Sequence, residues 1–311
     1  MKNKQYKVSV WMITYNHEKF ITQAIDSVLM QNVNFDYNIV IGEDCSTDNT
    51  RKILLEYKNK YPDKFKLLLH DKNIGITQNM IETYKSCEGE YIAMLEGDDY
   101  WIDKNKLQTQ VNYLENNKDC VLCYTKVNRV SSDGKFLKSS NPEDRPTTGL
   151  KEILSRGWFM HTGTLLYRNN LIKKFPDFFF KYRSTDYMLH VLLATHGKIG
   201  FIDIVSSSYR EHLGGITNDF RKEIIPFLNK KLCLLDEIDG FLNYEYSKEL
   251  KKQKKDINAS LFIHKLKSNN FTLLFSGIIN FVKGNKKTIL NRFFLFAKKR
   301  VPLVPKPFDK Q

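Results

Sequence analysis

Short apolar runs rich in β-branched residues alternate with stretches whose apolar residues recur at helical spacing, from residue 7 to residue 117. This alternation constrains the fold more than any other feature, because a strand followed by a helix brings the chain back to build a parallel sheet. Strands are predicted at 7–14, 37–42, 65–70 and 90–95. Helices are predicted at 18–31, 48–60, 77–86 and 104–117. We therefore expect an α/β fold with a mostly parallel sheet and helices on both faces.

Polar and acidic residues follow each predicted strand directly. They are Thr14-Tyr15-Asn16, Glu43-Asp44, Asn73 with Gly75, and Glu96-Gly97-Asp98-Asp99. The carboxyl ends of parallel strands meet at one edge of a sheet, which is where ligands bind. Carboxylates gathered there repel one another unless a cation or hydrogen-bond donors lie among them. Oxygen ligands on such a turn suit Mg²⁺ or Mn²⁺ shared with a diphosphate, and the alternative is a solvated acidic turn.

The composition excludes a disordered chain and a multi-span membrane protein, because 41% of the 311 residues are hydrophobic and 27% are charged. No run reaches the roughly 18 apolar residues of a spanning helix. The short run 8–14 predicts a first strand and no signal peptide. Five cysteines without framework spacing favour a reducing, cytoplasmic location. Cys120 and Cys123 match a zinc or redox motif, but they stand in a predicted strand without a second pair, so we interpret them as structural.

The second half of the chain is less regular. Residues 131–148 have the composition of a surface loop, followed by a predicted short helix at 150–154 and a strand at 164–167. An amphipathic helix is predicted at 185–196, and a strand or hairpin at 199–210. Past residue 220 the pattern is helical throughout. We expect one domain over 1–219, with halves 6–103 and 104–219, and a helical C-terminal region over 220–311.

Positive charge is concentrated in this C-terminal region. Residues 220–311 hold 20 Lys and Arg against 8 Asp and Glu, whereas residues 1–219 hold 29 against 27. Such asymmetry indicates a polyanionic neighbour, either a membrane surface or nucleic acid. The region is Lys-rich and contains no recognised nucleic-acid-binding module, so nucleic acid is not expected. Apolar runs at 271–282 and 293–296, bordered by Lys, favour peripheral docking on the inner face of the plasma membrane, and the alternative is an ordinary helical appendage.

Four segments together resemble family 2 glycosyltransferases, which have the GT-A fold, a Rossmann-like sheet. The segments are Val-Trp-Met-Ile-Thr-Tyr-Asn (10–16), Gly-Glu-Asp-Cys-Ser-Thr-Asp-Asn-Thr (42–50), Asn-Ile-Gly (73–75) and Gly-Glu-Tyr-Ile-Ala-Met-Leu-Glu-Gly-Asp-Asp-Tyr-Trp (89–101). The resemblance covers about residues 6–215. It identifies residues 6–103 as the nucleotide-sugar-binding half and 104–219 as the acceptor half.

The resemblance implies a set of donor-binding residues. Thr14 and Tyr15 would line the base pocket, Asp44 would bond the nucleobase, and Glu96 and Asp98 would contact the ribose and the metal. The full nucleotide-sugar set is Thr14, Tyr15, Glu43, Asp44, Asn73, Gly75, Glu96, Asp98 and Arg210, and the metal set is Asp98, Asp99 and His212. Glu43 and Glu96 stand where the family usually has Asp, which keeps the charge and lengthens the side chain.

The acceptor half supplies the implied catalytic base, Asp186, at the start of a predicted helix. An acid in a first helical turn also stabilises a helix without any catalysis, and the family usually has Glu-Asp where this chain has Thr185-Asp186. Arg210 and His212 match a segment that faces the diphosphate, although a lone His is more often structural. Trp158, Phe159 and His161 form either an acceptor-facing wall or part of the core.

The expected activity is transfer of a sugar from a nucleoside-diphosphate sugar, with UDP the expected nucleotide, to a hydroxyl of a glycan or lipid-linked acceptor, as in surface polysaccharide synthesis. A single displacement with Asp186 as base predicts inversion at the anomeric carbon. A non-catalytic nucleotide-sugar-binding homologue and a metal-dependent nucleotidyltransferase are the alternatives. The second would be expected to have a Gly-rich phosphate loop with a Lys near the N-terminus, which we do not find.

Overall fold

The computed structural model describes residues 5–140, 147–182, 185–215 and 223–267. The chain forms two compact units, Met1–Asp219 and Phe220–Gln311. The segments 271–282 and 293–296, on which the docking expectation depends, lie outside the described residues. Within the described residues, no helix is both long enough and apolar enough to cross a membrane.

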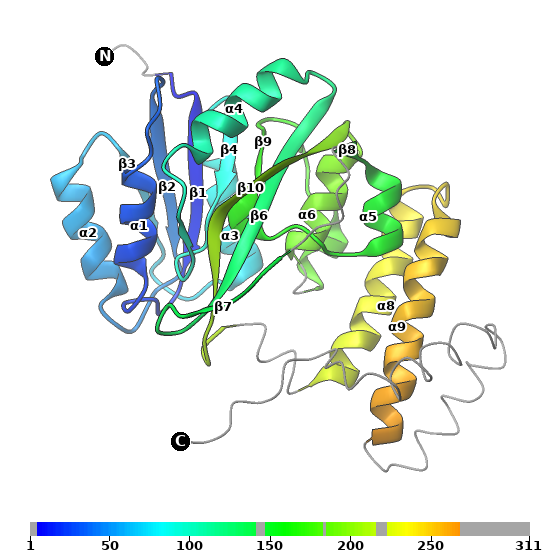
Figure 1. Cartoon of the computed structure of the whole chain (residues 1–311). Helices are drawn as coiled ribbons and strands as arrows, with labels where there is room; N and C mark the ends of the chain where they lie inside the picture. Colours follow the sequence, from blue (N-terminus) through cyan, green and yellow to red (C-terminus); the bar gives the residue numbers. More distant parts are fainter. Residues whose placement is uncertain (1–4, 141–146, 183–184, 216–222, 268–311) are drawn as a thin grey trace. The chain divides into compact units, whose positions relative to one another are not determined.

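One sheet organises the first unit, and its first half is parallel. The strands β1 (Val8–Thr14), β2 (Tyr37–Glu43), β3 (Phe65–Leu69) and β4 (Tyr91–Met94) stand in the order β3-β2-β1-β4, each parallel to its neighbour. These strands match the four predicted from the alternating pattern to within a residue or two. Their carboxyl ends therefore lie at a common edge of the sheet (Figure 1).

The other half of the sheet is mixed. The short β9 (Leu166–Arg168) pairs antiparallel with both β4 and β6 (Cys120–Ser131), and β10 (Lys198–Glu211) runs parallel to β6. The strand β5 (Tyr100–Trp101) pairs antiparallel with β10. Cys120 and Cys123 are both buried on β6, in agreement with a structural role.

Two local predictions differ from the structure. The 131–148 segment is not only a loop, because β7 (Phe136–Ser139) pairs with β6 and β8 (Thr147–Thr148) pairs with β10. The predicted strand at 164–167 begins as the 3₁₀ turn η1 (Thr162–Thr164) and continues as β9. Of the two alternatives for 199–210, the strand is confirmed and the hairpin is not, because ten residues of β10 pair along β6, with bulges that absorb the irregular pattern.

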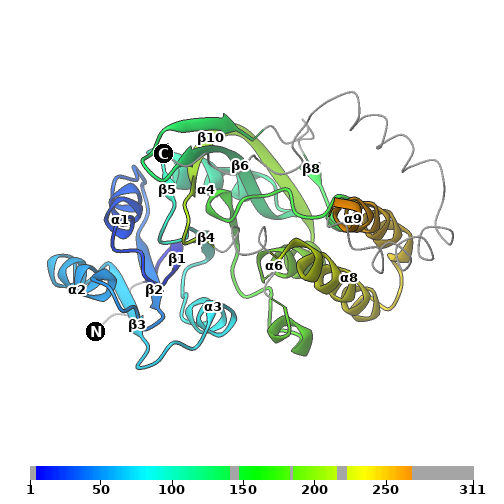
Figure 2. The same cartoon turned by 90° about the horizontal axis from the view of Figure 1, so that it is seen from below.

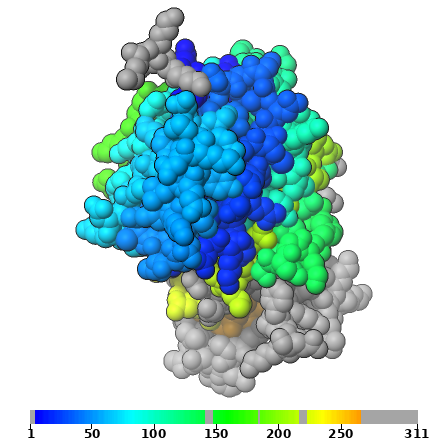
Figure 3. Space-filling view, turned by 90° about the vertical axis from the view of Figure 1, so that its left-hand side faces the viewer, coloured from blue at the N-terminus to red at the C-terminus, as the bar shows by residue number. Residues whose placement is uncertain are grey.

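Helices cover both faces of the sheet. The helices α1 (Ile21–Leu29), α2 (Thr50–Lys60) and α4 (Lys106–Asn116) lie on one face, and α3 (Ile76–Lys85) and α6 (Thr185–Ala194) lie on the other (Figures 1 and 2). Seen from the β3 side, β3 and α2 form the outer surface of the unit (Figure 3). A short helix, α5 (Leu150–Arg156), and a 3₁₀ turn, η2 (Asp177–Phe180), complete the first unit. The predicted α/β architecture is confirmed.

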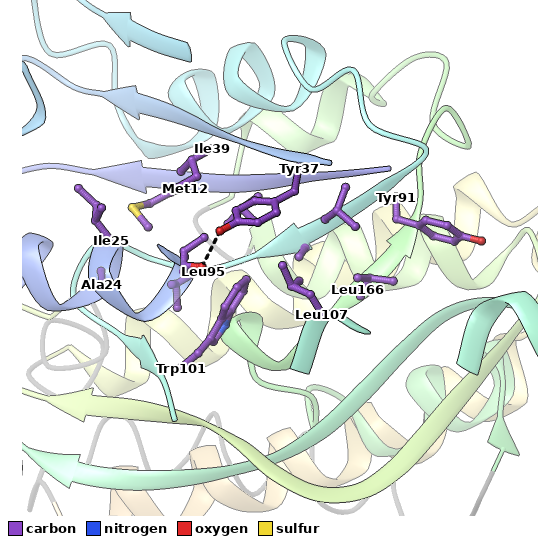
Figure 4. Packing of buried hydrophobic residues seen from close by; sticks show 14 of the residues in the cluster. Met12, Ala24, Ile25, Tyr37, Ile39, Tyr91, Leu95, Trp101, Leu107 and Leu166 are labelled. Carbon is purple, nitrogen blue, oxygen red and sulfur yellow. Dashed lines mark hydrogen bonds between the residues drawn. The ribbon is translucent and has the colours of Figure 1, made fainter. Parts of the chain in front are cut away.

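A hydrophobic core fixes α1 and α4 on the sheet (Figure 4). Alternate residues of β1 contribute Val8, Val10 and Met12, all fully buried, because successive strand residues point to opposite faces. Trp101 from β5 and Leu107 from α4 close the same cluster. Each such side chain contributes about 1.5–3 kcal/mol by its burial. The cluster anchors the strands whose ends carry the polar residues.

The second unit contains an α-helical hairpin within its described residues. The helices are α8 (Ile224–Phe241) and α9 (Ser247–Lys267), and the chain reverses through Asn243 and Tyr244, both with positive φ. The buried Asp239 accepts hydrogen bonds from the Ser247 hydroxyl at 2.8 and 3.0 Å, which ties the turn to α8. Residues 223–267 hold 9 Lys against 7 Asp and Glu, so most of the excess positive charge belongs to residues 268–311.

Candidate functional site

The polar loops after β1, β2 and β4 are joined to one another by backbone hydrogen bonds. The N–H of Asp44 donates to the Thr14 carbonyl at 3.1 Å, and the N–H of Gly97 donates to the Ile13 carbonyl at 3.1 Å. Thr14 and Glu43 are register partners at the ends of their strands. The expected gathering of polar residues at one sheet edge is therefore observed.

Gly97 allows the acidic turn to lie directly against the β1 loop. A Cβ atom at Gly97 would lie 2.7 Å from Thr14 Oγ1 and 2.9 Å from His17 Nδ1, closer than real Cβ contacts. Those two side-chain atoms are themselves 3.1 Å apart, at hydrogen-bond distance. Glycine at this position is thus required by close packing, and it places the neighbouring carboxylates beside His17.

Three carboxylates of this turn converge. One ligand oxygen from each of Glu96, Asp98 and Asp99 lies within 4.8 Å of the others. His212 Nε2 lies 2.9 Å from Asp98 Oδ2, and His17 Nε2 lies 3.8 Å from the same oxygen. Carboxylate oxygens with imidazole nitrogens form a donor set that suits Mn²⁺ or Mg²⁺. Asp98 and Asp99 of the metal set predicted from the sequence lie together with Glu96, whereas His212 contacts the group through Asp98.

The protonation of the three acids reflects their crowding. Burial, with the nearby charges of Asp98 and Asp186, raises the pKa of Glu96 to about 8. Burial and the charges of Asp98 and Glu96 raise the pKa of Asp99 well above its usual range. Burial also acts to raise the pKa of Asp98, but the positive charge that His17 can carry and the His212 hydrogen bond outweigh it, and the pKa is lowered. Such a cluster gains from a bound cation, which would relieve the repulsion.

Asp186 lies near the acidic turn although it is 90 residues away in the sequence. It opens α6, and its Oδ1 accepts a hydrogen bond from the Tyr187 N–H at 2.8 Å. Its charge contributes to the raised pKa of Glu96, so the two carboxyl groups interact electrostatically. The start of a helix favours an ionised acid. Thr185, where the family usually has an acid, is buried.

The Arg210 guanidinium binds protein groups around the acidic turn. Its Nε donates to the Asp98 carbonyl at 3.0 Å, Nη1 to the Ser132 carbonyl at 3.1 Å and Nη2 to Gln23 Oε1 at 2.6 Å. The side chain is buried between the rings of Phe20 and Tyr100, at 4.8 and 5.1 Å from their centroids. Its backbone N–H also donates to Asp99 Oδ1 at 2.8 Å. This arrangement favours a support for the turn over the direct donor contact expected from the sequence.

The acids after β2 likewise hold loops in place. Glu43 is fully buried, pairs with Arg51 and accepts the Ser46 N–H at 2.6 Å. Asp44 accepts the N–H groups of Ile74 and Gly75 at 2.7 and 3.1 Å.

The loop that Asp44 holds contains two more residues of the expected donor set. Gly75 has φ of +83°, a conformation that glycine adopts without strain. Its N–H also lies 3.1 Å from Asn73 Oδ1. Glu43, whose side chain is longer than that of the Asp usual in the family, reaches Arg51. Asp44 binds the Asn73–Gly75 loop to the end of β2.

Comparison with known proteins identifies the family. The model of glycosyl transferase family 2 matches residues 9–175, more than half of the chain. The chain belongs to this family. The uncharacterized protein Rv1520 of Mycobacterium tuberculosis is 33% identical over 210 residues, which are 67% of this chain and 60% of the relative. The poly(ribitol-phosphate) beta-N-acetylglucosaminyltransferase TarS of Staphylococcus aureus is 31% identical over 171 residues, 54% of this chain and 28% of that enzyme. The match thus spans less than two thirds of either relative.

Solved structures show the same fold at low sequence identity. The crystal structure of S. aureus TarS 1–349 in complex with UDP-GlcNAc has a TM-score of 0.57 and 18% identity, and the match covers 90% of this chain and 93% of that one. The mannosyltransferase PcManGT from Pyrobaculum calidifontis, in complex with GDP-Man and Mn²⁺, has a TM-score of 0.58 and 13% identity, covering 95% and 81%. The GT-A fold expected from the four motifs is confirmed.

Two residues of the candidate site were not identified from the sequence. His17 faces Asp98, and Gln23 on α1 holds Arg210. His17 carries a weak signal, since it follows the first strand within the polar run that begins at Thr14. Gln23 carries none, because its partner lies 187 residues away. Tyr15, an expected base-pocket residue, is 42% exposed, whereas Thr14 is buried and faces His17.

Proposed function

We propose that this glycosyltransferase moves a sugar from a nucleoside-diphosphate sugar, with UDP as the nucleotide, to a hydroxyl of a glycan or lipid-linked acceptor, with inversion. The observation that carries this proposal is the convergence of the Glu96, Asp98 and Asp99 carboxylates at the carboxyl edge of the sheet. The bound molecules in the TarS and PcManGT structures support a nucleotide-sugar donor.

Asp98, Asp99 and His212 would hold a divalent cation, Mn²⁺ or Mg²⁺, in this proposal. The cation would supply positive charge to the diphosphate of the donor. Glu96 would contact the ribose, and exposed Tyr15 would contact the base. In our proposal Arg210 does not contact the donor and holds the acidic turn in position through its hydrogen bond to the Asp98 carbonyl.

Asp186 acts as the base in this proposal. The acceptor oxygen forms a bond to the anomeric carbon while the bond from that carbon to the diphosphate oxygen breaks. The acceptor proton passes to the Asp186 carboxylate, and the electron pair of the broken bond leaves with the nucleoside diphosphate. A positioned base of this kind typically contributes about 10²–10⁴ in rate. Attack opposite to the leaving group inverts the anomeric carbon.

A donor screen tests the function directly. Purified protein is incubated with UDP-, GDP- and dTDP-sugars and Mn²⁺, with and without EDTA, and release of the nucleoside diphosphate is measured. We expect release from a UDP-sugar that EDTA abolishes, and an inverted product by NMR when an acceptor is added. Absence of release from every donor, with or without glycan acceptors, would refute the proposal. Release of pyrophosphate from a nucleoside triphosphate and a sugar phosphate would indicate a nucleotidyltransferase.

A further inference from the structure

An exposed tryptophan follows a sharp turn in the acceptor half. Helix α5 ends at Gly157, whose φ of +81° turns the chain, and its N–H donates to the Ile153 carbonyl at 2.8 Å. Trp158 follows with 39% of its surface exposed. Phe159 instead packs against Tyr124 of β6 at 5.8 Å between ring centroids. The structure thus separates two neighbouring aromatic residues, one toward solvent and one toward the sheet.

Trp158 rests on a stack of rings. Its centroid lies 4.6 Å from that of His161 with an interplanar angle of 71°, and His161 lies 5.0 Å from Tyr209 of β10. Tyr209 directly precedes Arg210, which binds the acidic turn. Two partly buried rings therefore hold the exposed indole in one orientation, which reduces the entropy that a ligand would have to remove.

The segment that carries Trp158 is bound to the strand that ends at the acidic turn. The Gly163 carbonyl accepts hydrogen bonds from Trp101 Nε1 at 2.8 Å and from the Ser207 hydroxyl at 2.7 Å. The Leu165 carbonyl accepts the N–H of Met94, two residues before Glu96. The indole is thus fixed to the same framework as the proposed catalytic site.

The same segment also lies close to α6, the helix that Asp186 opens. Burial and the nearby His161 lower the pKa of His190, one helical turn after Asp186, to about 3. Helix α5, which leads into this segment, contacts α6 directly.

Of the two arginines near these rings, Arg129 has a carboxylate partner and Arg156 contacts an aromatic ring. Arg129 pairs with Glu211 at 2.5 Å, and Arg156 lies over the Phe159 ring at 4.5 Å. Burial and Arg129 lower the pKa of His161 to about 3, so the ring is neutral at physiological pH. The carboxylates of the acidic turn and Asp186 would repel an anionic ligand placed between them and the indole. A neutral ligand with an apolar face fits this surface better.

We propose that Trp158, backed by His161, is the platform on which a neutral pyranose ring of the acceptor glycan stacks. The C–H groups on one face of a pyranose meet the electron-rich face of the indole, and the ring hydroxyls remain available for attack. This inference rests on the proposed glycosyl transfer and adds the acceptor class. A neutral pyranose acceptor would distinguish this chain from an enzyme whose acceptor is a phosphate-rich polyol chain.

Fluorescence provides a direct binding test. The chain has three tryptophans, and Trp11 and Trp101 are 3% and 1% exposed, so a solvent-dependent change in emission reports mainly on Trp158. Methyl glucoside, galactoside, mannoside and N-acetylglucosaminide are titrated in the presence of UDP and Mn²⁺, with ribitol 5-phosphate as the anionic probe. We expect a saturable blue shift with at least one glycoside, lost in Trp158→Phe. A shift with ribitol 5-phosphate alone, or none with any probe, would overturn the platform.

Kinetics separate the platform from the proposed function. Trp158→Ala should raise the acceptor KM about two- to thirteenfold, with Trp158→Phe intermediate, since aromatic stacking contributes in this range. Donor hydrolysis without acceptor should stay within about twofold of the wild-type rate, because water needs no platform. Leu55→Ala on α2, with 43% exposure, is the control for loss of an exposed apolar side chain. An unchanged acceptor KM in Trp158→Ala refutes the platform, whereas absence of donor turnover in the wild type refutes the glycosyl transfer itself.

Discussion

Substitution of Arg210 by Lys tests whether this residue supports the acidic turn or contacts the donor. Lys keeps the charge, but one ammonium group cannot reach the Asp98 carbonyl, the Ser132 carbonyl and Gln23 together. Loss of about two charge-assisted hydrogen bonds, each contributing about 1.5–3 kcal/mol, lowers the free energy of unfolding by about 3–6 kcal/mol. The Asp98 backbone is released as well, so the affinity for Mn²⁺ with UDP should fall about tenfold or more, as for other residues that orient metal ligands.

Arg168→Lys is the matched control. Arg168 also holds backbone carbonyls, those of Cys120 at 3.0 Å and Leu114 at 2.6 Å, but it stands on β9 away from the acidic turn. It should lose similar stability and keep wild-type Mn²⁺ affinity. Stability is measured by urea denaturation followed by circular dichroism, and Mn²⁺ affinity by calorimetry in the presence of UDP.

Two results would refute this reasoning. If Arg210→Lys loses stability but binds Mn²⁺ and UDP as the wild type does, the residue supports the fold alone. If stability is unchanged and UDP binding weakens even without metal, the guanidinium contacts the donor, as the sequence first indicated. Only combined loss of stability and metal affinity, absent in the Arg168 control, agrees with a positioning role.

Four further outcomes are expected. Asp98→Ala should abolish metal-dependent transfer without loss of thermal stability, because it removes one of three crowded carboxylates. Full activity of this variant, or wild-type activity that survives EDTA, would contradict the metal assignment. Asp186→Asn should bind nucleotide sugar normally and lose about 10²–10⁴ in turnover, and wild-type rates would place the base elsewhere. The pKa of His190 is about 3 in the folded protein and about 6.5 in the unfolded chain, so its contribution to stability is complete above pH 6.5 and is lost as the pH falls, by up to about 1.4 kcal/mol per pH unit. In His190→Gln, the free energy of unfolding measured with urea should therefore depend less on pH between pH 6.5 and 4. An unchanged pH dependence would contradict the burial argument. If residues 268–311 dock on a membrane, the full chain should co-sediment with anionic vesicles at low salt and not with neutral ones, and salt-independent binding would leave the appendage interpretation standing.

Local sequence patterns were sufficient for the elements and for much of the site. The period of the apolar residues marks each strand and helix of the first half, because that period follows from backbone geometry alone. Helix α1 begins at Ile21, three residues later than predicted, because His17 and Glu18 bond the loop before α2: the His17 N–H donates to Thr50, and Glu18 accepts from Asn49.

The acidic turn could also be found from the sequence, since Gly97 and its carboxylates are consecutive and follow a strand. Polar residues at the ends of parallel strands necessarily share an edge, so their gathering required no knowledge of distant contacts.

Only the tertiary structure decided what those polar groups do. Asp98 faces His212 across 114 residues, and Arg210 meets Gln23 across 187, so no local window contains either pair. Each buried donor takes whichever acceptor the packed sheet places beside it, because an unpaired buried polar group is costly. That is why the sequence could name Arg210 as a site residue and not reveal that its donors point to the protein. The same reason explains why Trp158 and Phe159, two aromatic residues adjacent in the sequence, point in different directions. Trp158 is exposed, whereas Phe159 packs against Tyr124 of β6.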